Sequence, residues 1–186
     1  AGDRTGLVFV FGRNDFGVWE KKDGSLTPGG EDVREFGYSV NSDGDLACVI
    51  SDGYWFYAHP GKQPRAHIYR NDGTQWVQIR RIDLPWYPPE AKECFIAGDT
   101  VAVQINKQRI HIYKHDQDLD SYQHKDSFER GVISMSFGRD HLIYLSGPNM
   151  GSTPYDEECY EHQSIIIYQC QDSDRGYTPQ QEIGFS

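Results

Sequence analysis

The sequence predicts an all-β chain of short antiparallel strands, mainly because one β-hairpin motif occurs four times. Each copy has an alternating apolar run that ends on an aromatic residue, then a polar turn containing Asp, then a second aromatic residue that opens the next run. Alternation on both sides of a polar turn is typical of a β-hairpin. The copies are 7–22, 66–82, 110–125 and 165–181, with the aromatic pairs Phe11 and Trp19, Tyr69 and Trp76, Tyr113 and Tyr122, and Tyr168 and Tyr177.

The composition supports the same fold class. Among 186 residues, 13% are aromatic and 19 are glycine, yet the mean hydropathy is -0.70. Apolar residues must therefore stand on alternating positions, as they do in all-β proteins with many turns. No stretch keeps the helical spacing of apolar residues long enough to predict a helix instead. The length of the chain suits one domain with an apolar core.

A second kind of hairpin precedes three of the four copies. In 33–53 the alternating run FGYSV, the turn NSDGD and the short apolar strand LACVI follow one another. Segments 94–105 and 133–147 repeat this arrangement around Gly98 and Gly138. The first copy is instead followed by 23–32, whose Gly, Pro and Asp residues predict a connector.

The repeating unit is therefore four short strands, and such a unit predicts a β-propeller. Matched aromatic residues lie roughly 44 to 58 residues apart, and four-stranded units of about 40 to 50 residues are typical of propeller blades. One sheet cannot bury both of its faces, so neighbouring sheets must cover each other. We predict one partial ring over 1–186 with about three and a half blades: an outer half-blade and connector at 1–32, then blades at 33–83, 84–128 and 129–186.

The residues of the predicted blade at 33–83 follow a specific order. The segment EFGYSV at 35–40 is followed by Gly44-Asp45, an apolar strand, His67-Ile68-Tyr69 and Trp76. This order resembles the FG-GAP repeat of integrin α-chain-like propellers; the next two units keep the Gly-Asp or Ile-Tyr pairs but lack the FG pair, and are degenerate. Residues 182–186, EIGFS, look like the start of another such element. The resemblance implies calcium-binding loops in some blades and favours an extracellular or cell-surface location, although the compartment stays open.

A ring of three and a half blades has open ends. Open ends leave unpaired strand edges and an uncovered sheet face, and both features favour association. Three explanations remain open: the chain is a piece of a longer propeller, it completes its ring with another chain, or the assignment of strands to blades is shifted.

The charge of the chain narrows the classes of partner. A formal net charge of -10 repels phosphate backbones and anionic lipid, which argues against nucleic-acid and membrane-surface binding. No run of 18 apolar residues predicts a membrane span. The opening residues AGDRTG show no apolar leader, so we expect either no signal peptide or one that has been removed.

The spacing of the cysteines and aspartates gives little support for a metal site or a reactive thiol. The four cysteines match no metal motif; Cys48 and Cys94 stand in apolar strands and are expected to be buried thiols, whereas Cys159 and Cys170 leave a local disulfide open. No cofactor is predicted. The weak calcium candidates are Asp43 and Asp45, in a turn too short for a calcium loop, and Asp116, Asp118 and Asp120, which lack the Gly and final Glu of an EF-hand.

Two long segments predict a binding face. Segments 51–65 and 146–162 fall at the same junction of their units and are expected to emerge on one face. Exposed aromatic residues with a few charges are typical of recognition sites, although Trp55 and Phe56 could instead fold back into the core. The predicted partner-binding residues are Tyr54, Trp55, Phe56, Tyr57, His59, Arg65, Tyr155 and Tyr160.

We therefore predict a non-catalytic interaction module that binds a protein partner or another copy of itself. One alternative is a carbohydrate-binding propeller whose aromatic residues stack on sugar rings. A second is a propeller-type glycoside hydrolase, for which only the acidic segment 155–162 supplies carboxylates. His67 and His111 occupy the same position of successive repeats, which predicts a structural role. No catalytic residue is assigned, because no known catalytic motif occurs.

Overall fold

The computed structural model describes residues 6–29, 33, 35–51, 63–85, 91–105, 109–129, 132–138, 141–146, 163–170 and 177–185. In these residues every regular element is a β-strand, as the sequence predicts. The strands are β1 (Val8–Arg13), β2 (Trp19–Leu26), β3 (Ser39–Asp43), β4 (Leu46–Ser51), β5 (Arg65–Asn71), β6 (Trp76–Asp83), β7 (Ala91–Ala97), β8 (Thr100–Ile105), β9 (Arg109–Asp116), β10 (Ser121–Glu129), β11 (Val132–Phe137), β12 (His141–Ser146), β13 (Gln163–Cys170) and β14 (Tyr177–Phe185).

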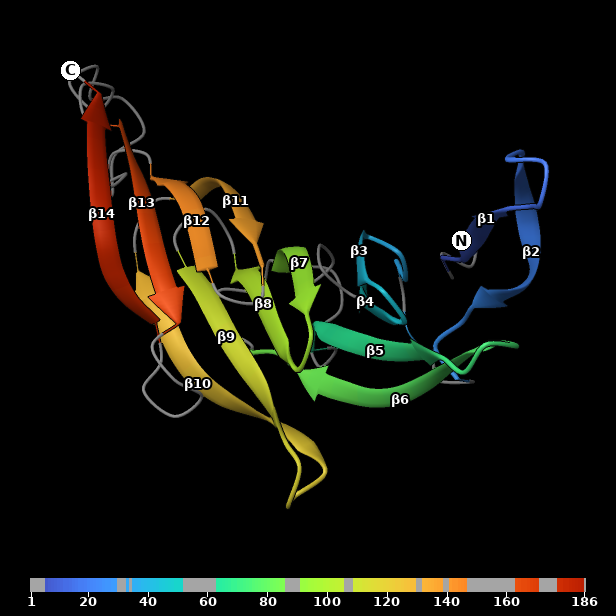
Figure 1. Cartoon of the computed structure of the whole chain (residues 1–186). Coiled ribbons are helices and arrows are strands. Elements are labelled where there is room, and N and C mark those ends of the chain that lie inside the picture. The colour runs from blue at the N-terminus through green and yellow to red at the C-terminus, as the bar shows by residue number, and fades with distance from the viewer. Residues whose placement is uncertain are drawn as a thin grey trace, which may run out of the picture. The chain divides into compact units, whose positions relative to one another are not determined.

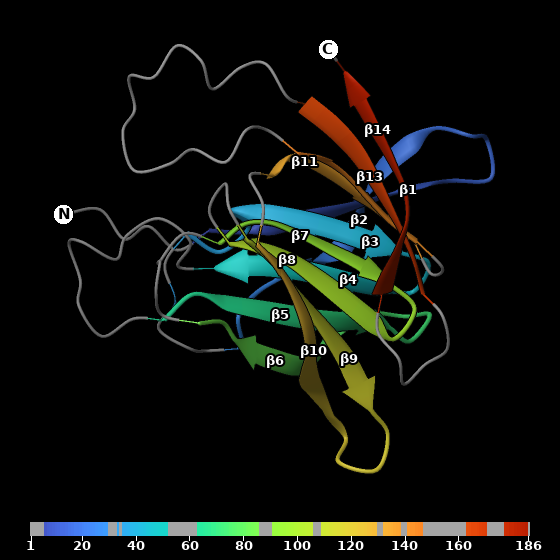
Figure 2. The same ribbon diagram turned by 90° about the vertical axis from the view of Figure 1, so that its left-hand side faces the viewer.

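The strands form one two-stranded sheet and three four-stranded sheets (Figure 1). β1 pairs with β2, and the larger sheets run β3-β4-β5-β6, β7-β8-β9-β10 and β11-β12-β13-β14, each in sequence order. Figure 2 shows the strands β3, β4, β5 and β6 side by side. The prediction of four-stranded antiparallel blades, about three and a half in number, is confirmed. The chain also divides into two compact units, Ala1–Cys94 and Phe95–Ser186, which we describe separately; the blade bounds at 33–83, 84–128 and 129–186 stay predictions.

All four copies of the hairpin motif form antiparallel hairpins with an irregularity at the same place. In β5–β6 the register shifts between Ile68 and Tyr69, directly before the aromatic residue. The shift lies between Ile167 and Tyr168 in β13–β14, and opposite Ile112 and Tyr113 in β9–β10. In β1–β2 it falls between Phe9 and Phe11. A bulge bends and twists its strand, so the four hairpins share a bend as well as a sequence pattern.

Two boundaries differ from the prediction. The connector expected from residue 23 begins later, because β2 continues to Leu26, which is buried. The chain passes Asp23-Gly24 without turning back, since Gly24 adopts φ +87° within the irregular part of the β1–β2 ladder. The end of the chain also differs: residues 182–185 do not open a new blade but complete β14, with Ile183 opposite Ile165 of β13.

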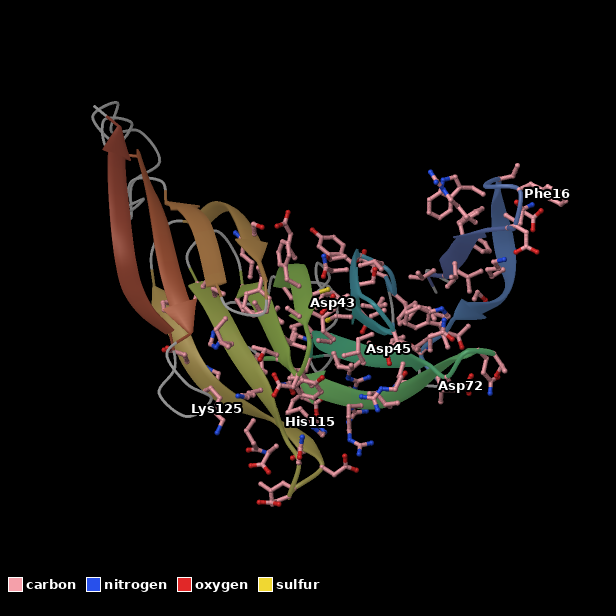
Figure 3. The ribbon with its side chains drawn as sticks, in the orientation of Figure 1. Phe16, Asp43, Asp45, Asp72, His115 and Lys125 are labelled. Atoms are coloured by element: carbon pink, nitrogen blue, oxygen red, sulfur yellow. The ribbon has the colours of Figure 1, made fainter. Side chains whose placement is uncertain are left out.

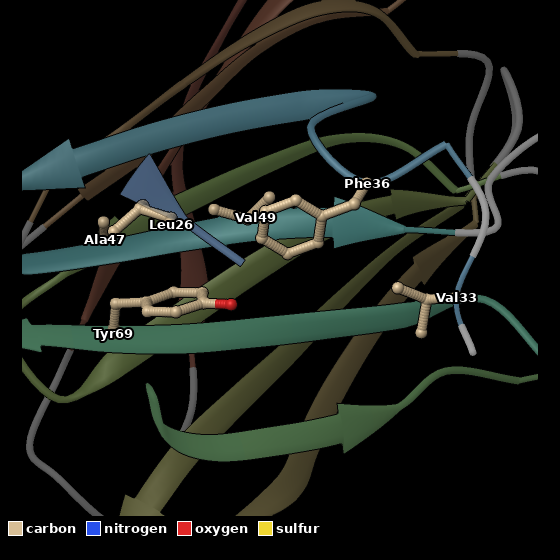
Figure 4. Close-up of a cluster of buried hydrophobic side chains, with 6 residues drawn as sticks. All are labelled: Leu26, Val33, Phe36, Ala47, Val49 and Tyr69. Atoms are coloured by element: carbon tan, nitrogen blue, oxygen red, sulfur yellow. The ribbon is translucent and has the colours of Figure 1, made fainter. Parts of the chain in front are cut away.

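Each unit has its own apolar core. In the first unit, Leu26, two residues that precede β3 and three residues of the sheet β3–β6 form a cluster against which Val8, Val10 and Trp76 pack (Figure 4). The buried members are Leu26, Val33, Phe36, Ala47, Val49 and Tyr69. In the second unit, the cluster joins β8, β9 and β10 to β12 through Ala102, Ile110, Ile112, Phe128 and Leu142. Both cores therefore bury the face of one sheet against another, as stacked blades require.

The turns of β1–β2, β5–β6 and β9–β10 are stabilised by an Asp or Asn at or just after the end of the first strand. Asn14 Oδ1 accepts hydrogen bonds from the amides of Phe16 and Val18 at 3.0 and 2.9 Å. Asp72 Oδ1 accepts from the Thr74 hydroxyl at 2.7 Å and from the Thr74 and Gln75 amides. These bonds lower the pKa of Asp72, as expected for a carboxylate that accepts several hydrogen bonds.

Candidate functional site: the exposed face of the first hairpin

Most of the residues that the sequence predicted to bind a partner lie outside the described residues. These are Tyr54, Trp55, Phe56, Tyr57, His59, Tyr155 and Tyr160. Arg65 is described: it opens β5 opposite Asp83 of β6, and its Nε lies 3.6 Å from Asp83 Oδ1. Its charge is therefore matched within its own sheet, and Arg65 stays a predicted contact residue.

A different aromatic surface stands out, on the β1–β2 hairpin. The residues of β1 alternate between partly buried and exposed, so that Val8 and Val10 face the core cluster. Phe9 and Phe11 lie on the opposite face, 49% and 55% exposed. Trp19 of β2, directly opposite Arg13, is 61% exposed. We call Leu7, Phe9, Phe11 and Trp19, with Arg13 and Lys21, the outer face of the hairpin.

Comparison with the equivalent residues of the other hairpins shows what is unusual here. Tyr69 and Tyr113 occupy the position of Phe11, yet they are only 2% and 5% exposed. Tyr69 is covered because the β1–β2 hairpin packs on it, and its hydroxyl donates a hydrogen bond to the carbonyl oxygen of Thr27 at 2.6 Å. In the described residues, nothing equivalent covers Phe11. The same motif thus builds a buried face in one sheet and an exposed face in another.

Two cations lie over the rings of the outer face. Lys21 Nζ stands 4.1 Å from the centre of the Phe9 ring, and the Arg13 guanidinium stands 5.3 Å from that of Trp19. A cation over an aromatic ring is held by the ring quadrupole and shields it in part from water. The outer face is therefore apolar and positive on a chain whose net charge is -10, which suits a partner surface that combines apolar and acidic side chains.

The calcium candidates lie at two hairpin turns, β3–β4 and β9–β10, and Figure 3 labels Asp43 and Asp45 of the first. Asp43 ends β3, and the exposed Asp45 lies 3.9 Å from Arg70. Asp116 Oδ1 accepts hydrogen bonds from the amides of Asp118 and Leu119. Asp120 Oδ1 lies 3.3 Å from His115 Nε2. In the described ranges no three His, Cys, Asp or Glu side chains converge as metal ligands, and Asp45, Asp116 and Asp120 each contact a protein group instead.

Cys48 and Cys94 are buried free thiols, as predicted. Cys94 Sγ donates to the carbonyl oxygen of Cys48 at 3.3 Å, and the Cys94 amide donates to Ser39 Oγ. Burial raises the pKa of the Cys48 thiol, and the neighbouring Cys94 adds to the effect. A buried thiol with a raised pKa is unreactive, so the pair serves packing. The disulfide that the sequence left open between Cys159 and Cys170 involves side chains outside the described part of the chain.

A polar cluster on β9 and β10 joins two histidines and a serine. His111 Nδ1 lies 3.1 Å from His124 Nε2, and Ser127 Oγ lies within 3.1 Å of both nitrogens. Desolvation lowers the pKa of His111 to about 4, with further contributions from His124 and Arg109. His67, at the equivalent position of β5, is fully buried and 2.9 Å from Ser51 Oγ. Both histidines are buried and lie within hydrogen-bonding distance of side chains of their own sheet, which fits the predicted structural role.

The His111 cluster predicts acid sensitivity. The folded-state pKa of about 4 lies below the usual value near 6.5, so the unfolded chain binds more protons between these values. Stability should therefore fall as the pH drops from about 6.5 to about 4, by on the order of 2 kcal/mol. Urea denaturation at several pH values, compared between the parent chain and His111→Asn, measures the difference. A proton NMR titration of His111 with a midpoint near 6.5 would contradict the prediction.

The fold and the comparisons define a class of protein. Repeated four-stranded antiparallel sheets, each covering a face of the next within its unit, make this chain a β-propeller-type module. The sequence matches no protein-family model, and it matches no curated protein. Within the described ranges no helix has the length and hydropathy to cross a bilayer.

Two solved structures align with this chain. Sqt1 of Saccharomyces cerevisiae, a WD40-type β-propeller, aligns with a TM-score of 0.53 at 7% identity, over 79% of this chain and 35% of Sqt1. A protein from Lactobacillus plantarum aligns with a TM-score of 0.45 at 8% identity, over 95% of this chain and 66% of that protein. This chain thus spans about a third of the length of Sqt1. The predicted β-propeller fold is confirmed by the first similarity, which at such low identity concerns the fold alone.

Proposed function

We propose that this chain is a non-catalytic interaction module that binds another protein through the outer face of the β1–β2 hairpin. The single observation that carries the proposal is the exposure of Phe9 and Phe11, beside the exposed Trp19, at positions whose equivalents in β5 and β9 are buried. Large exposed apolar patches on a soluble protein mark interaction sites. Trp and Arg are also the side chains that most often dominate the energy of protein interfaces.

The inner face of the hairpin gives the outer face a fixed support. Val8 and Val10 pack on the core cluster, and Gly37 approaches Val8 so closely that an added Cβ would lie 3.0 Å from its Cγ2. Aromatic side chains on a supported strand lose little freedom when they bind, which favours affinity. A second copy of the chain is the alternative partner, since two outer faces could bury each other.

We also propose that the blade at 33–83 is an FG-GAP repeat and that the next two units are degenerate copies of it. The FG pair has a physical role that fits such a repeat. Phe36 is buried in the core cluster, and Gly37 adopts φ +88°, which favours glycine. The proposal concerns the repeat alone, and it assigns no calcium and no ligand to this chain.

The proposed function predicts that Phe11→Ser with Trp19→Ser weakens partner binding at least tenfold, because both central aromatic residues are lost. A photo-crosslinker at position 9 would identify the partner, and titration calorimetry with the purified partner would measure the affinity. Leu119→Ser is the matched control, since Leu119 is equally exposed but lies in the β9–β10 turn. Equal affinity of all three chains would overturn the proposal. A doubled mass of the parent chain that the double variant abolishes would instead identify a second copy as the partner.

A further inference from the structure

Three polar side chains of the β9–β10 hairpin have a geometry that hydrogen bonds alone do not explain. His111 Nδ1, His124 Nε2 and Ser127 Oγ form a triangle with sides of 3.1, 2.8 and 3.1 Å. In a neutral ring, an imidazole nitrogen carries either a hydrogen or a lone pair, and a hydroxyl has one hydrogen. At most two sides of the triangle can therefore be linear hydrogen bonds. The third side brings two polar atoms together without a hydrogen of its own.

The bulge in β10 brings these three groups to one face of the hairpin. His124 and Ser127 are three residues apart, and such residues point to opposite faces of a regular strand. The register shifts between His124 and Asp126, so that Ser127 lies opposite His111 on the face of both histidines. Asp126 Oδ1 accepts a hydrogen bond from the Ser127 amide at 2.7 Å. Bulges that re-aim a side chain in this way are frequent next to functional sites.

The corresponding bulge of β5–β6 carries side chains of a different chemistry. There Gln78 lies opposite Tyr69, and Arg81 lies opposite His67. An amide and a guanidinium thus take the places of the second imidazole and the hydroxyl. A guanidinium has no lone pair to offer to a cation. The two imidazoles and the hydroxyl of β9–β10 are therefore not a general requirement of the bulge.

The spacing of the triangle fits three ligands of one metal ion. Two ligand atoms about 2.1 Å from an ion, at right angles to each other, lie about 3.0 Å apart, which is close to the length of all three sides. Imidazole nitrogen is a good ligand for Ni²⁺ and Cu²⁺, and right angles between ligands are typical of their octahedral or tetragonal coordination. His124 is exposed, so water can occupy the remaining coordination positions.

The surroundings of the two rings leave their facing nitrogens available to an ion. Nε2 of His111 is buried and has no hydrogen-bond partner in the described residues, so the ring can carry its hydrogen there without losing a hydrogen bond at that atom. Nδ1 then has its lone pair free for a metal. The His124 ring lies 5.2 Å from that of His111 and packs edge-on against Tyr113 at 5.5 Å. Ligands that are held by packing need little ordering when an ion binds.

We propose that His111 Nδ1, His124 Nε2 and Ser127 Oγ bind a divalent transition-metal ion such as Ni²⁺ or Cu²⁺, which would fix β10 to β9 at the bulge. Zn²⁺ fits less well, because it prefers a tetrahedral set of ligands with a wider spacing. A hydroxyl is a weak third ligand, and the positive charge of Arg109 acts on His111 and opposes a cation. We therefore expect a dissociation constant in the micromolar range. The site is independent of the outer face of the β1–β2 hairpin.

Titration calorimetry of the whole chain with Ni²⁺, in a buffer that does not bind metal, tests the proposal. Mg²⁺ is the control ion, because it prefers oxygen ligands but is attracted equally by the net charge of -10. His124→Asn removes one exposed ligand and should leave the fold intact. His115→Asn is the matched control variant. His115 lies on the same face of β9 (Figure 3), but its Nε2 lies 3.3 Å from Asp120 and outside the triangle.

We expect a saturable Ni²⁺ site whose affinity falls at least tenfold in His124→Asn, falls less in Ser127→Ala, and is unchanged in His115→Asn. Mg²⁺ should show no saturable binding at the same concentrations. Paramagnetic broadening by Ni²⁺ of the imidazole proton signals of His111 and His124 locates the ion by NMR. Equal Ni²⁺ affinity of the parent chain and His124→Asn, or equally tight binding of Mg²⁺, would overturn the inference. Broadening of other histidine signals, with those of His111 and His124 unchanged, would overturn it as well.

Discussion

Leu26→Ala is expected to lower the free energy of unfolding of the first unit by about 3 kcal/mol. Leu26 ends β2, is 3% exposed, and packs in the cluster with Phe36 and Tyr69. Truncation removes the apolar atoms that attach the end of the hairpin to the sheet β3–β6, and it leaves a cavity that a close-packed core fills only in part. Urea denaturation followed by tryptophan fluorescence measures the loss, since Trp76 packs against the same cluster.

Leu119→Ala provides a control with the same chemical change. Leu119 lies in the turn between β9 and β10 and is 64% exposed, so its truncation should change the free energy of unfolding by less than about 0.5 kcal/mol. Similar losses for the two variants would mean that Leu26 is not buried. The expected loss at Leu26 also bears on the function, because the outer face keeps its orientation only while β2 is attached to the core.

The hairpins were predictable because their signals are local. Alternation fixes which residues of a strand share a face, and an Asp or Asn at the strand end fixes the turn, as Asn14 and Asp116 show. Leu26 was missed for a physical reason. Asp23-Gly24 has the sequence of a turn, but Gly24 passes through a left-handed conformation inside a continuing strand. The same residue types, Asp and Gly, occur in bulges and in turns. Only the tertiary contact of Leu26 shows that the strand continues here.

The candidate site was not predictable from the same signals. Phe9 and Phe11 alternate in sequence just as His67 and Tyr69 do, but the first two are exposed and the last two are buried. The difference depends on which sheet covers which face, and a local pattern contains no information about that. The sequence did predict that open propeller ends expose a sheet face. The contact residues that it named, however, all lie in the long segments 51–65 and 146–162, most of which lie outside the described residues.

Gly6→Ala is expected to destabilise the first unit by about 2 to 3 kcal/mol, which is typical of an overpacked site. Gly6 precedes β1, and a Cβ added there would overlap the carbonyl oxygen of Phe36. Because that atom belongs to the backbone, neither a rotamer change nor a small shift of a side chain relieves the clash. Phe36 is buried in the core cluster, so either β1 separates from the sheet β3–β6 or Phe36 moves out of the cluster.

Gly12→Ala is the matched variant, because Gly12 lies in β1, the strand that Gly6 precedes, and neither glycine has a positive φ. A Cβ at Gly12 would approach Cε of Lys22 at 2.6 Å, and the flexible end of a lysine can move away at little cost. We therefore expect a change of less than about 1 kcal/mol for Gly12→Ala, measured by urea denaturation of both variants. Gly6→Ala should also accelerate amide exchange in β1 relative to β9, since the β1–β2 hairpin would lose its contact with Phe36. If the two variants are equally stable, β1 does not approach Phe36 as described, and the outer face has no fixed support.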